Sequence, residues 1–272
     1  MEYTTNMQLK KYLNKFPQKH KEELIKKDSL RLIYNEIMGE NDLSSLCGIE
    51  NRARFLRNEK AIGELAMLLK TNGFTPLFFK GIELAKKLYG TPWVRMVGDI
   101  DFYVPGNSVN EYTNILNKNG FRLKYRNGKD NKHHWVFLKD NVVYEAHLNL
   151  FNPVIEIDES CFCQDKFLRQ SEYYIFDETL TFVHMLLHLY MDCCLWLDFT
   201  PTTREETIEK VSRFTYRSYE LVLFAEKKNL NIDWEYVHQS VKNQKFIAIY
   251  QLMLDAIEML FPYFKNFRLK MS

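Results

Sequence analysis

Two carboxylates spaced one residue apart are the first residues of this chain that could do chemistry. Asp99 and Asp101 follow Gly98 and begin an apolar run with the sequence DIDFYV. Because successive side chains of a strand point to opposite faces, both aspartates should project from the same side. Like charges in apolar surroundings are costly, although an isolated Asp-x-Asp pair can also be two solvated carboxylates at a sheet edge. The apolar context favours a divalent metal between them.

A third acid lies downstream in the run VVYEAHL, where Glu145 and His147 should share one strand face. Three carboxylates on neighbouring strands could bind one or two divalent ions, which would hold a triphosphate and activate an acceptor hydroxyl. His133 and His134 could border the same cleft. Alternation predicts, however, that two adjacent histidines of one strand do not face one ligand.

Basic and glycine residues upstream could bind phosphate. Lys80 and Gly81 lie where a predicted strand gives way to a helix, and free N–H groups at a helix start favour anions. Arg95, four residues before Asp99, could neutralise a polyphosphate, and Gly98 directly precedes the acidic strand. The alternatives are a surface lysine, a turn glycine and an arginine paired with a surface acid. Together with the acids, these residues indicate phosphoryl or nucleotidyl transfer.

Two further histidines, His184 and His188, are four residues apart and should share a face of the predicted helix 179–197. Cys193 and Cys194 follow them, so a zinc site is conceivable. The sequence HMLLH nevertheless lacks the central glutamate of a metalloprotease helix. We therefore interpret these histidines as lining either the core or, with His147, the acceptor side of a cleft.

Hydrophobic periodicity predicts the elements that must position these residues. The predicted fold class is α+β, with a small mixed sheet in a core between helical flanks. Predicted helices are 8–38, 51–72, 82–89, 108–119, 179–197, 204–228 and 234–261, and predicted strands are 76–79, 99–104, 121–125, 134–138 and 142–150. The predicted domains are an N-terminal helical region (1–72), the α/β core (73–160) and a C-terminal helical domain (161–272).

Composition excludes some classes of protein. Of the 272 residues, 46% are hydrophobic and 15% aromatic, which predicts a folded chain rather than a disordered one. The net charge of +2 does not indicate that the protein binds nucleic acid, although the lysine-rich residues 9–27 could form a basic groove.

The cysteines and the first segment bear on the compartment of the protein. Five cysteines, an odd number, and a first segment without a signal-peptide core predict a cytoplasmic protein with free thiols. Its apolar runs are too short for a membrane span, so no membrane partner is expected.

These motifs resemble those of a known group. Lys80-Gly81 after a strand, the segment YGTP followed by Arg95 and Gly98-Asp99-Ile100-Asp101, and then Glu145-Ala146-His147 are similar to the uncharacterised bacterial nucleotidyltransferases of the polymerase-beta-type superfamily. The resemblance covers roughly residues 60–155 and extends into the later helices. It implies Mg²⁺ (or Mn²⁺) held by Asp99, Asp101 and Glu145, and attack of an acceptor on the α-phosphate of a nucleoside triphosphate. Lys80-Gly81 stands where the wider superfamily usually has glycine followed by serine, so Lys80 would replace the hydroxyl contact to phosphate.

The acceptor could be a small molecule, a protein or RNA. Two alternatives to an ordinary nucleotidyltransferase remain. One is a nucleotide-binding regulatory pseudoenzyme, which would keep the pocket without the reaction. The other is a toxin-like enzyme that modifies tRNA and would use the lysine-rich residues 9–27.

Overall fold

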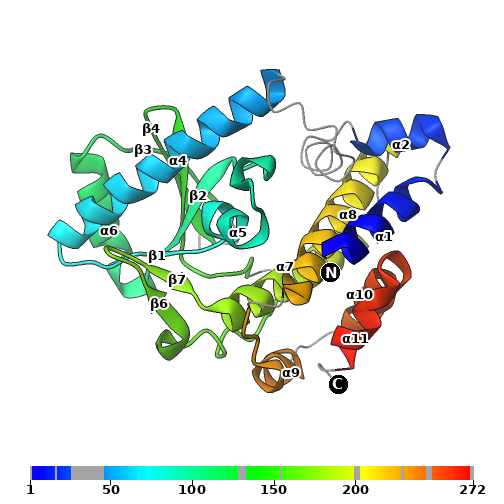
Figure 1. Ribbon diagram of the computed structural model, residues 1–272. Coiled ribbons are helices and arrows are strands. Elements are labelled where there is room, and N and C mark those ends of the chain that lie inside the picture. Colours follow the sequence, from blue (N-terminus) through cyan, green and yellow to red (C-terminus); the bar gives the residue numbers. More distant parts are fainter. Residues whose placement is uncertain are drawn as a thin grey trace. The chain divides into compact units, whose positions relative to one another are not determined.

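The computed structural model describes residues 2–15, 17–25, 46–127, 133–153, 155–198, 203–227, 230–242 and 247–269 (Figure 1). The chain divides into two compact units, one of Leu46–Thr181 and the other of Met1–Ser45 with Phe182–Ser272. The predicted domain boundaries near residues 72 and 160 stay predictions. Contacts nevertheless group the helix predicted at 51–72 with the sheet.

A mixed sheet forms the centre of the unit Leu46–Thr181. In the part of the chain that the structure describes it has seven strands, in the order β3-β4-β5-β2-β1-β7-β6. Strand β2 pairs parallel with β5, and β1 pairs parallel with β7, while the other neighbours are antiparallel. The strands are β1 (Leu77–Phe78), β2 (Asp99–Tyr103), β3 (Arg122–Asn127), β4 (His134–Lys139), β5 (Val142–His147), β6 (Phe167–Arg169) and β7 (Tyr174–Phe176). This confirms the predicted α+β class with a mixed sheet.

The apolar side chains of the sheet pack against helices of the same unit. These helices are α4 (Leu46–Thr71), α5 (Gly81–Leu88) and α6 (Val109–Lys118). Phe55, Ile62 and Leu65 of α4 lie in one buried cluster with Ile100 and Phe102 of β2. Tyr144 and Ala146 of β5 belong to the same cluster. Since alternate residues of β2 and β5 are used in this core, the residues between them face the other side.

The other unit is helical. It contains α1 (Glu2–Leu13), α2 (Gln18–Ile25), α8 (Arg204–Glu226), α9 (Trp234–Lys242), α10 (Ile247–Leu260) and α11 (Lys265–Arg268), together with α7 (Glu178–Asp198) from Phe182 onward. Helix α8 begins at a capping box of Thr203 and Glu206, which satisfies two free N–H groups at its start. Tyr219 of α8 donates a hydrogen bond to Asn6 of α1 at 2.8 Å, which ties the N-terminal helix to α8.

The sheet contains two strands that were not expected from the sequence. These are the short strands β6 and β7, and they extend the sheet into a region assigned to the C-terminal helical domain. Three residues are too few to show a clear period of two. The helix predicted over 234–261 is described as two helices, α9 and α10, and residues 243–246 lie outside the described residues. Part of the helix predicted at 8–38 also lies there, since residues 26–38 are among those not described.

Candidate active site

The register between β2 and β5 places the acidic residues side by side. Asp101 pairs with Glu145, and Tyr103 pairs with His147. On the other side of β5, His147 pairs with His134 of β4. Because paired residues on adjacent strands share a face, Asp101, Glu145, His147 and His134 lie on the face opposite the apolar cluster. The strand that carries Glu145 is therefore the direct neighbour of the strand that carries the two aspartates.

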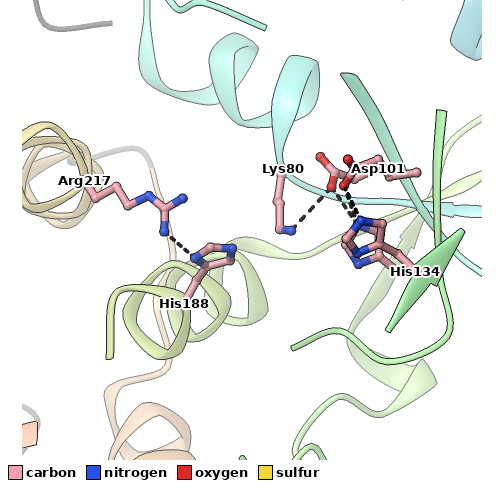
Figure 2. Close-up of polar contacts among 7 residues, drawn as sticks. Lys80, Asp101, His134, His188 and Arg217 are labelled. Atoms are coloured by element: carbon pink, nitrogen blue, oxygen red, sulfur yellow. Dashed lines mark hydrogen bonds and ion pairs between the residues drawn. The ribbon is translucent and has the colours of Figure 1, made fainter. Parts of the chain in front are cut away.

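Asp101 is the most strongly engaged acid. It is only 7% exposed, and its carboxylate accepts a hydrogen bond from Nε2 of His147 at 2.8 Å. The ammonium of Lys80 lies 3.4 Å from the same oxygen (Figure 2). Burial acts to raise the pKa of Asp101, but the charge of Lys80 and the hydrogen bond from His147 outweigh it and hold this pKa below its usual range. Asp101 is thus an ionised buried carboxylate.

Asp99 has the opposite electrostatic state. The negative charge of Asp101, then burial, then the charge of Glu145 raise the pKa of Asp99 to about 7. Lys80 and His147 only partly oppose this shift. The face therefore carries more negative charge than its neighbouring basic groups neutralise, which is the condition that a bound cation relieves.

The donor set fits a divalent cation. One ligand atom each from Asp101, Glu145 and His147 lies within 4.8 Å of the others. Oε2 of Glu145 is 3.5 Å from Nε2 of His147 and 3.8 Å from Nε2 of His134. Carboxylate oxygens suit Mg²⁺ or Mn²⁺, and imidazole extends the range to other transition metals.

The junction of Lys80 and Gly81 has a backbone conformation that depends on glycine at one position. Lys80 has φ 64° and Gly81 has φ 40°, and α5 begins at Gly81. A β-carbon on Gly81 would lie 3.5 Å from the side chain of Val97, so space is available and the dihedral angle is the reason for glycine. This turn directs Lys80 toward Asp101. Positive φ at a residue other than glycine is typical of strained functional positions.

Arg95 lies close to the same junction. Its guanidinium donates a hydrogen bond to the carbonyl oxygen of Gly81 at 3.3 Å. Asn51 of α4 in turn donates to the carbonyl oxygens of Trp93 and Arg95, and so holds this segment from the helix side. Sequence reasoning missed Asn51, since a single asparagine in a helix carries no motif. Gly98 directly precedes β2, as predicted.

The histidines near the acids are arranged differently from the prediction. His133 lies in a bend before β4, which begins at His134, so the alternation rule does not apply to this pair. The ring centroids of His133 and His134 lie 5.3 and 5.1 Å from that of His147. Burial is the main cause that lowers the pKa of His133 to about 3 and also lowers the pKa of His134. Both are therefore neutral imidazoles near pH 7.

His184 and His188 belong to the helical unit. Their ring centroids are 5.7 Å apart, as expected for one helix face. Nη1 of Arg217 on α8 lies 2.5 Å from Nδ1 of His188 (Figure 2). Arg217 also forms an ion pair with Asp192. Burial raises the pKa of Cys193 to about 12, so its thiol is protonated near pH 7 in the metal-free protein. Whether the two histidines line an acceptor site stays a prediction.

The sheet thus gathers carboxylates, histidines and a lysine on one of its faces. The family described as "Uncharacterised nucleotidyltransferase" matches residues 43–262, so the chain belongs to that family. Membership supports nucleotidyl transfer as the general reaction. No curated protein and no solved structure matches the chain. Among the described residues, no helix has both the length and the apolar character needed to cross a membrane.

Proposed function

We propose that this protein is a metal-dependent nucleotidyltransferase of the polymerase-beta type, which moves a nucleoside monophosphate from a nucleoside triphosphate to an acceptor. The observation that carries this proposal is the pairing of Asp101 with Glu145 across β2 and β5, next to Asp99 and under Lys80. Acids that a protein fold holds in excess of their basic partners are a feature of functional sites.

Asp99, Asp101 and Glu145 would hold Mg²⁺ or Mn²⁺. The bound ion would neutralise the charge of the triphosphate and favour the deprotonated form of the acceptor group. The raised pKa of Asp99 fits this role, because a cation between the acids would remove the repulsion that causes the shift. His147 would orient Asp101 through its hydrogen bond.

Lys80, Gly81, Arg95 and Gly98 would contact the triphosphate. Lys80 already lies beside Asp101, and Arg95 braces the turn where α5 begins. Backbone N–H groups at a helix start and charge-assisted contacts from lysine or arginine both favour phosphate. In this proposal Lys80 contacts both Asp101 and the phosphate, and so replaces the serine that the wider superfamily usually has.

Labelled nucleotides test this function. The purified protein is incubated with each α-labelled nucleoside triphosphate and Mg²⁺, with and without cell extract. The expected result is label on a small molecule, a protein or RNA, and no label with the Asp99→Asn/Asp101→Asn variant. Nucleotide binding without transfer under any condition would instead support the regulatory pseudoenzyme. Label confined to tRNA would support the toxin-like alternative.

The acceptor side is proposed to involve His184 and His188. In this proposal the α/β core provides the metal and phosphate groups, and the two histidines on one face of α7 bind or deprotonate the acceptor. The matched test is His188→Gln, which keeps a hydrogen-bonding side chain beside Arg217. Reduced turnover at unchanged nucleotide affinity supports the role. Lower stability with unimpaired turnover per folded molecule contradicts it.

A further inference from the structure

A second group of possible metal ligands lies beside the acidic face. One nitrogen each from His133, His134 and His147 lies within 4.8 Å of the others. The three side chains are buried, with exposed fractions of 9%, 7% and 2%. Burying a ring nitrogen without a hydrogen-bond partner costs free energy, and a bound metal ion would remove that cost.

The backbone brings the three rings together through a bend. The carbonyl oxygen of His133 accepts hydrogen bonds from the N–H groups of Leu148 at 2.9 Å and Asn149 at 3.5 Å. These bonds fasten the residue before β4 to the residues after β5. As a result, His133 approaches His147 from the bend while His134 approaches it along the β4–β5 register. Phe79 packs edge-on against the ring of His147 at 5.1 Å and limits its rotation.

The hydrogen bond to Asp101 determines which nitrogen of His147 can bind a metal. A carboxylate only accepts, so Nε2 of His147 carries the proton and Nδ1 carries the lone pair. Among the described residues, neither Nδ1 of His147 nor Nδ1 of His133 has a hydrogen-bond partner, although both atoms are buried. A histidine that donates one N–H to a carboxylate and offers its other nitrogen is the usual arrangement at protein metal sites.

We propose that His133, His134 and His147 bind one transition-metal ion of the zinc type through their imidazole nitrogens. This ion is chemically different from the Mg²⁺ or Mn²⁺ of the acidic face, because nitrogen donors select zinc-like metals and carboxylate oxygens select magnesium-like ones. Tetrahedral zinc at about 2.1 Å from each nitrogen needs nitrogens about 3.4 Å apart. The three nitrogens lie within 4.8 Å of one another, so the side chains would have to adjust to this spacing when the ion binds. His147 would then connect the two sites, because its Nε2 donates to Asp101 and its Nδ1 would bind the ion.

The inference does not depend on nucleotidyl transfer, and its test uses no nucleotide. Untagged, metal-free protein is titrated with Co²⁺ in the presence of excess Mg²⁺, and the visible absorption of tetrahedral Co²⁺ is recorded. We expect one Co²⁺ per chain, displaced by Zn²⁺. His133→Gln should weaken Co²⁺ binding by more than about 100-fold, because even the loss of a supporting partner costs 10–100-fold. The matched control is His238→Gln on α9, which should bind like wild type.

Two results would overturn the proposal. One is equal Co²⁺ affinity of wild type and His133→Gln, and the other is no Co²⁺ binding when Mg²⁺ is present. X-ray absorption of the zinc-loaded wild type gives a readout that needs no variant. Three nitrogen neighbours at about 2.0–2.1 Å support the site, whereas a shell dominated by oxygen places the ion on the acids and contradicts it. Failure here leaves the nucleotide-labelling test unaffected, since that test needs only Mg²⁺.

Discussion

Each unit of this protein places a histidine beside a carboxylate and a basic side chain, but the charges balance differently. In the helical unit, Arg217 forms an ion pair with Asp192 and a hydrogen bond with His188. In the unit that contains the sheet, Lys80 and His147 both contact Asp101, while Asp99 and Glu145 add further negative charge. The same kinds of residue thus form a paired contact in one unit and a surplus of acid in the other. Under the proposed function, this surplus is the charge that a bound cation would neutralise.

The largest expected effect is that of Asp101→Asn, because the proposed function makes Asp101 a metal ligand. Asp101→Asn should lower the rate of nucleotidyl transfer by at least about 100-fold, because it removes a charged metal ligand. Metal-dependent nucleotide binding should fall as well, as measured by calorimetry with and without Mg²⁺. The control is Asp140→Asn in the β4–β5 turn, where φ is 51° and asparagine is well tolerated. Unchanged Mg²⁺-dependent binding in Asp101→Asn would show that the metal assignment is wrong.

The next effect concerns the basic side of the same cluster. Lys80→Ala should weaken nucleotide binding by about 1.5–3 kcal/mol, since a charge-assisted contact to phosphate is lost. Arg95→Ala is measured beside it and should act in the same direction. Lys60→Ala is the control, because Lys60 is an exposed side chain paired with Glu64 on α4. Wild-type affinity in both Lys80→Ala and Arg95→Ala would remove these residues from the phosphate site.

For the paired contact in the helical unit we expect the reverse pattern. Asp192→Asn should lower the free energy of unfolding by about 1–3 kcal/mol, because it leaves Arg217 without its charged partner. Turnover per folded molecule should change far less than in Asp101→Asn. Glu209→Gln is a matched control, since its exposed ion pair with Arg213 on the surface of α8 is worth less than about 0.5 kcal/mol. Urea unfolding measures the free energy of unfolding of both variants. Equal losses in Asp192→Asn and Glu209→Gln would contradict this prediction.

The smallest expected effect is a pH dependence of the metal-free protein. The folded state raises the pKa of Asp99 to about 7, so its contribution to stability is full below the ordinary pKa of aspartate and is lost as the pH rises through 7. In a chelator, the unfolding temperature should therefore fall between about pH 6 and about pH 8, on the order of 2–4 °C. Asp99→Asn should flatten this slope, and excess Mg²⁺ should remove it. If the unfolding temperature of Asp99→Asn fell as steeply with pH, the dependence would belong to another group.

The elements that carry the acids could be predicted because each has a strong local signal. Alternation placed Asp99 and Asp101 on one face, and the predicted strands 134–138 and 142–150 form the hairpin that carries Glu145. The structure confirms these strands to within a few residues at their ends. Periodicity is strong here because β2 and β5 have one side in a core and the other beside charge.

Other parts depend on contacts between distant segments, which no local pattern reports. Lys80 was predicted to bind phosphate, but its contact with Asp101 comes from the positive φ at its own position. The approach of His133 depends on hydrogen bonds from residues after β5. The strands β6 and β7 are recognisable only through their pairing with each other and with β1. In each case, tertiary structure decides what the local sequence leaves open.

The parallel pairing of β2 with β5 has a consequence for the order of events during synthesis. Asp101 and His147, which share a hydrogen bond, are 46 positions apart in the chain, and α6 and the strands β3 and β4 lie between them. A nascent chain that has exposed β2 but not β5 contains Asp99 and Asp101 without Glu145 or His147. Since a contact between such distant residues forms late in folding, the chain should gain its affinity for metal only when β5 has paired with β2. Metal loading would then report on completed folding, and incomplete chains would remain inert toward nucleotides.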